Sequence, residues 1–174
     1  YIVASHQDPD ICGSLAVTED IINNSDLQIV AHSKTIRLIR HHGLRSPFYA
    51  TDKESPIITL KSGRELECIS SPYLHAPGAI VTYDRQTKTL FSSDLFGAIS
   101  QDWSLFAKDD YLTPMRIFHE IYMPSNAILK KFLTKLKNYD IERIAPQHGS
   151  VIEGNNVQEA IDFLMNVKCG IDLE

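Results

Sequence analysis

Four polar loops, each directly after a short apolar run, place the strongest constraint on how this chain can fold. The apolar residues 1–4 predict a buried strand, and the segment from His6 to Asp10 follows at once. Three further loops contain His75, Asp94 and His148, again where a predicted strand has just ended. One loop histidine or aspartate alone is weak evidence, because such residues usually face solvent or cap turns. The ordered set of four is more specific and predicts a metal site built from loops at strand ends.

The rest of the pattern is typical of an α+β or sandwich-type chain. Apolar runs and turn signals predict strands at 1–4, 27–31, 57–60, 65–70, 79–83, 88–92 and 143–145, and those from 57 to 92 form two hairpins. Helical spacing predicts helices from about 12 to 22 and at 35–42, 112–123, 125–137 and 155–168. Because the chain opens inside a strand, we expect the natural protein to have further strands upstream.

Length and composition fit one domain, residues 1–174, with 170–174 as the start of a linker. The net charge of -5 at pH 7 argues against binding to nucleic acid or a membrane surface. No apolar run approaches the roughly 20 residues of a membrane-spanning helix. The three cysteines are widely spaced, which favours free thiols and a cytoplasmic protein over a disulfide framework or a thiolate zinc site.

The segment His6-Gln7-Asp8-Pro9-Asp10 has two interpretations when it is considered alone. His6, Asp8 and Asp10 alternate, so in extended backbone their side chains point the same way, and in a loop they can converge on a metal. In the other interpretation the segment is a polar loop between a strand and a helix, and Asp10 caps that helix. The segment by itself leaves both open.

Together with the three later loops, this segment resembles the signature of the metallo-β-lactamase superfamily, an HxHxDH segment followed by a His, an Asp and a His. Within it, the chain is most similar to the diiron branch of flavodiiron proteins and oxygen-binding diiron proteins, which has a carboxylate at the second His position. Asp8 stands at that position here. The resemblance extends from His6 to the helix after His148. It implies an αββα sandwich, which we expect to lack its N-terminal strands in this chain.

The resemblance also implies two iron ions, bridged by hydroxide, oxo or O₂. By this resemblance, one iron is expected to bind His6, Asp8 and His75, and the other is expected to bind Asp10 and His148. Asp94 is expected to bridge the two irons. Three carboxylates and three imidazoles make a harder, more anionic set than the zinc sites of hydrolases, and such mixed ligation suits non-haem iron that meets O₂. Two metals about 3.5–4 Å apart can hold a small diatomic molecule between them.

The chain departs from the family pattern at two positions. Ile11 stands where the superfamily signature has its final histidine. The second iron then has one protein ligand fewer and keeps a water or an open position at which O₂ can bind. Asp8 stands where flavodiiron proteins commonly have Glu, which is longer by one methylene. Both differences concern the geometry of the site rather than its presence.

Other reactive side chains have structural interpretations. His41 and His42 are expected to compensate the dipole of a helix end, and His119 to pack or to face solvent. Cys12 is expected to be a small buried residue. Five aromatic residues are predicted either to wall a pocket over the metals or to belong to the ordinary core; they are Phe48, Tyr49, Tyr73, Phe91 and Phe96.

Four functions remain in competition. An O₂-binding or O₂-sensing diiron module, with NO as the alternative ligand, is favoured because this chain contains no flavodoxin-like sequence. A flavodiiron-like O₂ or NO reductase core would need an electron donor from elsewhere. Asp8 and Ile11 argue against a zinc-dependent hydrolase, and the complete ligand set argues against a relative that has lost its metals. By resemblance, a homodimer and a fused or separate signalling or electron-donor domain are compatible partners.

Overall fold

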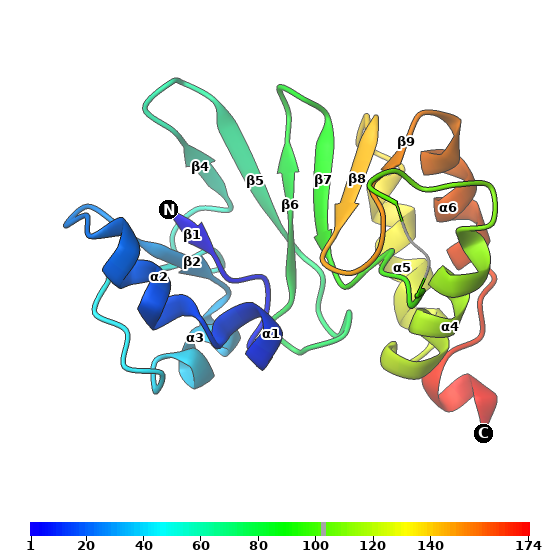
Figure 1. Cartoon of the computed structure of the whole chain (residues 1–174), viewed down its shortest axis with the longest axis horizontal. Coiled ribbons are helices and arrows are strands. Elements are labelled where there is room, and N and C mark those ends of the chain that lie inside the picture. The colour runs from blue at the N-terminus through cyan, green and yellow to red at the C-terminus, as the bar shows by residue number, and fades with distance from the viewer. Residues whose placement is uncertain (102–103) are drawn as a thin grey trace.

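The computed structural model describes residues 1–101 and 104–174 (Figure 1). In chain order its elements are β1 (Ile2–Val3), α1 (Pro9–Cys12), α2 (Leu15–Ile22), β2 (Ile29–Ala31), α3 (Ser33–Ile39), β3 (Phe48–Ala50), β4 (Ile57–Thr59), β5 (Glu65–Ser70), β6 (Ile80–Asp84), β7 (Thr89–Ser93), α4 (Leu112–Tyr122), α5 (Asn126–Leu136), β8 (Arg143–Pro146), β9 (Ile152–Glu153), α6 (Asn155–Leu164) and the short 3₁₀ helix η1 (Gly170–Leu173).

Two sheets lie at the centre of the molecule (Figure 1). The smaller sheet has the order β1-β2-β3, and its strands are parallel. The larger sheet has the order β4-β5-β6-β7-β8-β9, and its strands are antiparallel except for the parallel pair β7-β8. Because parallel strands end at the same edge, Ser93 of β7 pairs with Pro146 of β8 at the point where both strands stop. The loops that contain Asp94 and His148 therefore begin side by side.

Three apolar clusters hold four layers together. Helices α1 to α3 pack on the smaller sheet through a cluster that includes Leu15, Ile29 and Ile39. The two sheets meet through Val30 and Ile80. Helices α4 to α6 cover the other face of the larger sheet and share with it the most extensive cluster (Figure 1). The order helix, sheet, sheet, helix is the αββα sandwich that the sequence predicts, and this prediction is confirmed.

The helix expected from about residue 12 to 22 is two helices, α1 and α2. It begins earlier, at Pro9, whose fixed φ suits the first position of a helix. It is interrupted because Ser14, with φ -98° and ψ 1°, leaves the helical conformation. Strands β3 and β9 were not predicted, since three and two residues are too few to establish an alternating pattern.

Asp84, at the end of β6, supports a prediction about stability. Its side chain is fully buried and accepts hydrogen bonds from Arg64, Thr87 and the backbone amide of Gln86. The hydrogen bond from Arg64 is the main reason that the pKa of Asp84 falls to about 2, whereas the unfolded carboxyl titrates near about 4. The ionised Asp84 carboxylate thus contributes fully to the stability of the folded protein above about pH 5, and this contribution is lost as the pH falls towards 2. We expect Asp84→Asn to lower the free energy of unfolding at pH 7 by about 2 kcal/mol.

Urea unfolding at pH 7 and pH 3 measures this effect, and the difference between variant and parent should shrink at pH 3. Asp20→Asn is the control, because Asp20 pairs with Arg45 while both side chains are mostly exposed. An exposed pair of this kind contributes roughly 0–1 kcal/mol. Equal losses in the two variants would contradict the special role of the buried Asp84.

Candidate metal centre

The predicted loops converge, and all six predicted ligands lie together. Three overlapping groups have ligand atoms within 4.8 Å of one another; they are His6, His75 and Asp94, then His6, Asp8 and Asp10, then Asp10, Asp94 and His148. The segments that supply them follow β1, connect β5 to β6, follow β7 and connect β8 to β9. Four loops that are distant in sequence therefore place three carboxylates and three imidazoles in one region.

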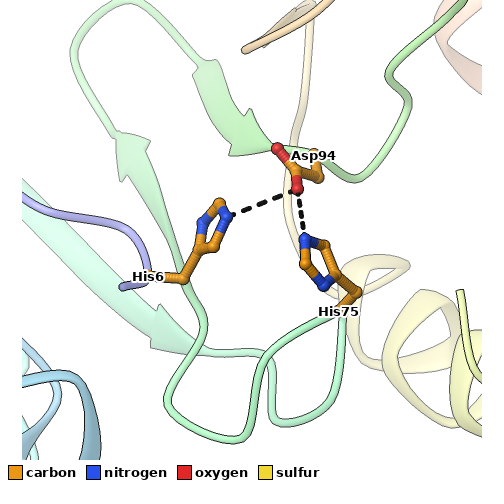
Figure 2. A group of neighbouring side chains, drawn as sticks. All are labelled: His6, His75 and Asp94. Carbon is orange, nitrogen blue, oxygen red and sulfur yellow. Dashed lines mark ion pairs between the residues drawn. The ribbon is translucent and has the colours of Figure 1, made fainter. Parts of the chain in front are cut away.

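The first cluster contains two imidazoles and two carboxylates. The Oδ2 atom of Asp94 lies 2.8 Å from Nε2 of His75 and 3.4 Å from Nε2 of His6. Figure 2 shows one carboxylate oxygen of Asp94 directed at both rings. The Oδ2 atom of Asp8 lies 3.3 Å from Nε2 of His75 and 3.8 Å from Nε2 of His6. One oxygen from each carboxylate thus lies close to both ring nitrogens, an arrangement of donors that a metal ion could use.

The second cluster lies on the other side of Asp94. The Oδ2 atom of Asp10 is 3.0 Å from Nε2 of His148, and the Oδ1 atom of Asp94 is 3.8 Å from the same nitrogen. Asp94 therefore presents Oδ2 to the first cluster and Oδ1 to the second. A carboxylate placed in this way can bridge two ions.

Unpaired polar atoms test whether the residues fit metal ions. Among the described residues, His6 Nε2 and Asp94 Oδ1 are buried and have no hydrogen-bond partner. Burial of such an atom without a partner costs about 1–3 kcal/mol, so both are expected to have a partner in the functional state. Both atoms face the clusters described above. The arrangement fits cations that would satisfy them.

The directions in which the pKa values of His6 and Asp94 shift fit the same conclusion, whereas the hydrogen bond to Asp94 raises the pKa of His75. Burial lowers the pKa of His6, although Asp94 and Asp8 oppose this shift. Burial acts to raise the pKa of Asp94, but the hydrogen bond from His75 and the nearby imidazoles outweigh it, and the pKa is lowered. A neutral imidazole and an ionised carboxylate are the forms that bind metal.

Two serine hydroxyls next to the Nδ1 atom fix the orientation of the His6 ring. Its Nδ1 atom lies 3.1 Å from the hydroxyl of Ser93 and 3.2 Å from that of Ser5. If Nε2 binds a metal ion, Nδ1 carries the proton and donates to Ser93, a contact that would hold His6 in the ligating tautomer. The fully buried thiol of Cys12 donates to the His6 carbonyl at 3.0 Å, so the prediction of a small buried residue is confirmed. All three cysteines lie in the described part of the chain, buried and with free thiols, as expected.

The loops around Asp94 and His75 contain backbone that only glycine adopts easily. Tyr73, Ser93 and Phe96 have φ values of +65°, +55° and +68°. Each lies within two residues of His75 or Asp94. Conformations of this kind persist only where surrounding contacts impose them, and they concentrate at functional sites.

His119 supplies one of these contacts. It is fully buried in α4, its Nε2 atom accepts the backbone amide of Phe96 at 3.1 Å, and its Nδ1–H donates to the Met115 carbonyl at 2.7 Å. Burial lowers the pKa of His119 to about 4, so the ring is neutral at physiological pH. Of the two expectations for His119, packing is correct, and the residue also holds the loop that follows Asp94.

A cavity of about 660 Å³ opens over the clusters. Its lining residues are Asp8, Asp10, His75, Asp94, Ala98, Ile99, Ser100, Ser104, Lys108, Asp110, Tyr111, Pro114, Phe118, Tyr122, Gln147, His148, Gly149 and Ser150. The ring of Phe118 lies 5.7 Å from that of His148, and the ring of Tyr122 lies 6.2 Å from that of His75. The cavity thus combines the candidate ligands with an aromatic wall.

The aromatic wall differs from the one that the sequence suggested. Within the described residues, none of Phe48, Tyr49, Tyr73, Phe91 and Phe96 lines the cavity; Phe96 belongs to the core, and Phe91 and Tyr73 are about half exposed. The wall comes instead from Tyr111, Phe118 and Tyr122. Their spacing of seven and four residues is a helical face and was the available signal.

Three further residues lie outside the site. His41 and His42 are exposed just beyond the end of α3 and do not line the cavity. Ile11 is partly buried and packs against the cluster between α1 and the smaller sheet. Ile11 offers no donor atom, so the second cluster has fewer potential ligands than the first.

Comparison with known proteins gives the family. A family model described as ODP family beta lactamase matches residues 1–149. The chain belongs to the ODP family. A solved structure of the chemotaxis sensor ODP, as its peroxy diiron species, is 30% identical with a TM-score of 0.85, and the match covers 99% of this chain and 72% of that chain. The apo state of the chemotaxis sensor ODP from T. denticola is 31% identical with a TM-score of 0.82, covering 98% and 71%. The sequence-based assignment to the diiron branch is confirmed.

Curated relatives of the ODP-family chain are longer proteins. The anaerobic nitric oxide reductase flavorubredoxin of Klebsiella pneumoniae is 28% identical over 173 residues, which are 94% of this chain and 35% of that protein. Diflavin flavoprotein A 1 of Synechocystis is 28% identical over 167 residues, which are 89% of this chain and 27% of that protein. The chain thus spans between about a quarter and a third of these relatives. In the part of the chain that the structure describes, each helix is too short or too polar to cross a bilayer.

Proposed function

We propose that this chain is a non-haem diiron module that binds O₂, with NO as the alternative ligand, and acts as a sensor of that gas. The observation that carries the proposal is the position of Asp94, which turns one carboxylate oxygen to each of two clusters of potential ligands. A mononuclear site would need only one of them. The similarity to a chemotaxis sensor in a diiron state supports the same conclusion.

The ligand assignment follows the two clusters. One ion would be held by His6, Asp8 and His75, the other by Asp10 and His148, and both by Asp94, a division supported by the distances between these side chains. Two ferrous ions would supply the electrons that O₂ accepts when it binds. The carboxylates offset much of their charge, and Ser93 keeps His6 in the ligating tautomer. Because Ile11 gives no donor, the second ion would have fewer protein ligands than the first, which would favour binding of a small molecule there.

Iron is favoured over zinc by the composition of the set. Three carboxylates and three imidazoles form a hard, anionic environment, and mixed His and carboxylate ligation with open positions is typical of non-haem iron that meets O₂. Phe118, Pro114 and Ile99 give the cavity an apolar side that suits a small apolar gas, while much of the rest of the lining, which includes Lys108 and Asp110, is polar. A hydrolase would instead use a zinc-bound hydroxide as its nucleophile, and zinc sites of that kind are richer in histidine than this ligand set.

A reductase core is the second candidate. It is favoured by the 28% identity to a nitric oxide reductase flavorubredoxin, of which this chain matches 35%. Such a function needs electrons from a flavin or another donor, which a further domain, a second copy of this chain or a separate protein would deliver. The sensor proposal needs a partner as well, because the signal of ligand binding must reach an output domain.

Anaerobic purification, metal analysis and an absorption spectrum before and after air test the proposal. We expect about two irons per chain and a visible band that appears with O₂ and disappears when O₂ is removed. Continuous consumption of O₂ or NO with a supplied donor would support the reductase instead. Zinc in place of iron, with a spectrum that ignores O₂, would contradict both.

A further inference from the structure

The loop that carries Asp94 and the loop that carries His148 are joined along their backbones. The Ser93 carbonyl accepts the Gln147 amide at 2.7 Å, and the His148 carbonyl accepts the Ala98 amide at 3.1 Å. These bonds fix the two ends of the contact. Between them, the bend of each loop over the cavity depends on what the loops pack against.

Tyr111, which precedes α4, is the side chain against which both loops pack. Its side chain is buried, and its hydroxyl donates to the Phe96 carbonyl at 2.9 Å. A Cβ atom on Gly149 would lie only 2.7 Å from the Tyr111 oxygen, so the hydroxyl rests directly against the backbone after His148. Burial raises the pKa of Tyr111 to about 12, and a hydrogen bond with the backbone of Ser150 opposes this shift. The hydroxyl is thus protonated at neutral pH and contacts both loops.

A second side chain, His119 of α4, forms a hydrogen bond with the backbone amide of Phe96. His119 accepts the Phe96 amide, while Tyr111 binds the Phe96 carbonyl. Phe96 is two residues after Asp94 and has a φ of +68°, which needs support from its surroundings. The Asp94 loop is therefore clamped at both polar groups of one residue, but only Tyr111 extends the contact to the His148 loop.

We propose that Tyr111 is a positioning residue for the second metal, the ion that Asp10, Asp94 and His148 would hold. The inference rests on the proposed function and adds a residue outside the predicted ligand set. By separating the two loops, the hydroxyl sets the distance between Asp94 Oδ1 and His148 Nε2, now 3.8 Å. Its removal leaves the Phe96 carbonyl without this donor and opens a gap beside Gly149 into which the His148 loop can relax.

The first cluster is expected to respond much less. His6 follows β1 and is held by Ser93, while His75 lies in the loop between β5 and β6. The shared ligand Asp94 is held on this side by His75, 2.8 Å from its Oδ2 atom, and Tyr111 makes none of the contacts described for the two histidines. Loss of the hydroxyl should thus weaken the second site selectively, about 10–100-fold, the usual effect of removing a residue that supports metal ligands.

Anaerobic titration of the full chain with cobalt(II), followed by visible absorption, tests the inference with Tyr111→Phe. The binding step that His148→Ala abolishes identifies the second site. Tyr83→Phe is the matched control, because Tyr83 is also buried and its hydroxyl donates to the Asp140 carbonyl at 2.6 Å, near the far end of β6 from the metal ligands. Both Phe variants should lower the melting temperature of the metal-free protein by similar amounts.

We expect Tyr111→Phe to weaken the second cobalt step at least about 10-fold and to change its spectrum, while the first step stays within about 3-fold. Tyr83→Phe should change neither step. Equal weakening of both steps in Tyr111→Phe, or no change in either, would overturn the positioning role. The diiron proposal would still stand in that case, provided that the parent protein binds two cobalt ions. A parent protein that binds no cobalt would overturn both.

Discussion

Replacing Asp94 by Asn is expected to abolish binding at both metal positions. The Asp94 carboxylate presents Oδ2 to His6 and His75 and Oδ1 to His148, so one substitution removes a charged donor from each cluster. Loss of a residue that merely supports a ligand costs about 10–100-fold in metal affinity, and loss of a shared ligand should exceed this. Metal analysis of anaerobically purified Asp94→Asn should find less than about one iron per chain, and its spectrum should not respond to O₂.

Thermal unfolding with and without iron(II) separates this effect from damage to the fold. A ligand at 100 times its dissociation constant stabilises the folded state by about 2.7 kcal/mol, so iron should raise the melting temperature of the parent protein but not of Asp94→Asn. Asp162→Asn is the control, because Asp162 is an exposed acid on α6 that bonds to Gln158. Two irons and an unchanged spectrum in Asp94→Asn would contradict the bridging assignment.

The candidate ligands were predictable because each follows a signal that is local in sequence. An apolar run ends, and a His or Asp stands in the next few positions, as at His6 after β1 and Asp94 after β7. The parallel pair β7-β8 then brings Asp94 beside His148, since parallel strands end at the same edge. Local sequence patterns therefore identify the candidate ligands, and the topology of the sheet brings these ligands together in space.

The wall of the cavity was not predictable in the same way. The hydrophobic spacing of α4 indicates a helix with one apolar face, but it does not say that part of this face covers a cavity rather than a sheet. Met115 lies in the core, Phe118 belongs to the core and also lines the cavity, and the half-exposed Tyr122 lines the cavity. That division depends on how α4 docks on the larger sheet, which is a long-range property.

Ile11 has a side chain whose location could not be predicted from the motif. Its place in the signature predicts a missing ligand, and its side chain indeed offers no donor. The motif does not say where the side chain goes, and the structure places it against the cluster between α1 and the smaller sheet. An apolar residue in this position contributes to packing, so substitution by His would place a polar ring against that cluster.

Gly149→Ala is expected to destabilise the protein by about 3–4 kcal/mol, for two separate reasons. Gly149 has a φ of +95°, and side chains other than that of glycine are strained in such backbone by about 1–3 kcal/mol. Its added Cβ would also lie 2.7 Å from the Tyr111 hydroxyl and 3.0 Å from the Ala98 Cβ. The first reason concerns the backbone alone, and the second concerns the contact between the two ligand loops.

Gly63→Ala separates these two contributions. Gly63, in the turn between β4 and β5, has a φ of +83°, but a Cβ there meets no atom within 4 Å. Its substitution should therefore cost only the same backbone strain, about 1–3 kcal/mol, and should leave cobalt binding unchanged. Urea unfolding of both variants should show the larger loss in Gly149→Ala, together with weaker cobalt binding at the cluster of Asp10 and His148. Equal losses with unchanged cobalt binding would mean that the His148 loop yields to a methyl group at no cost, and that its close contact with Tyr111 does not position the ligand.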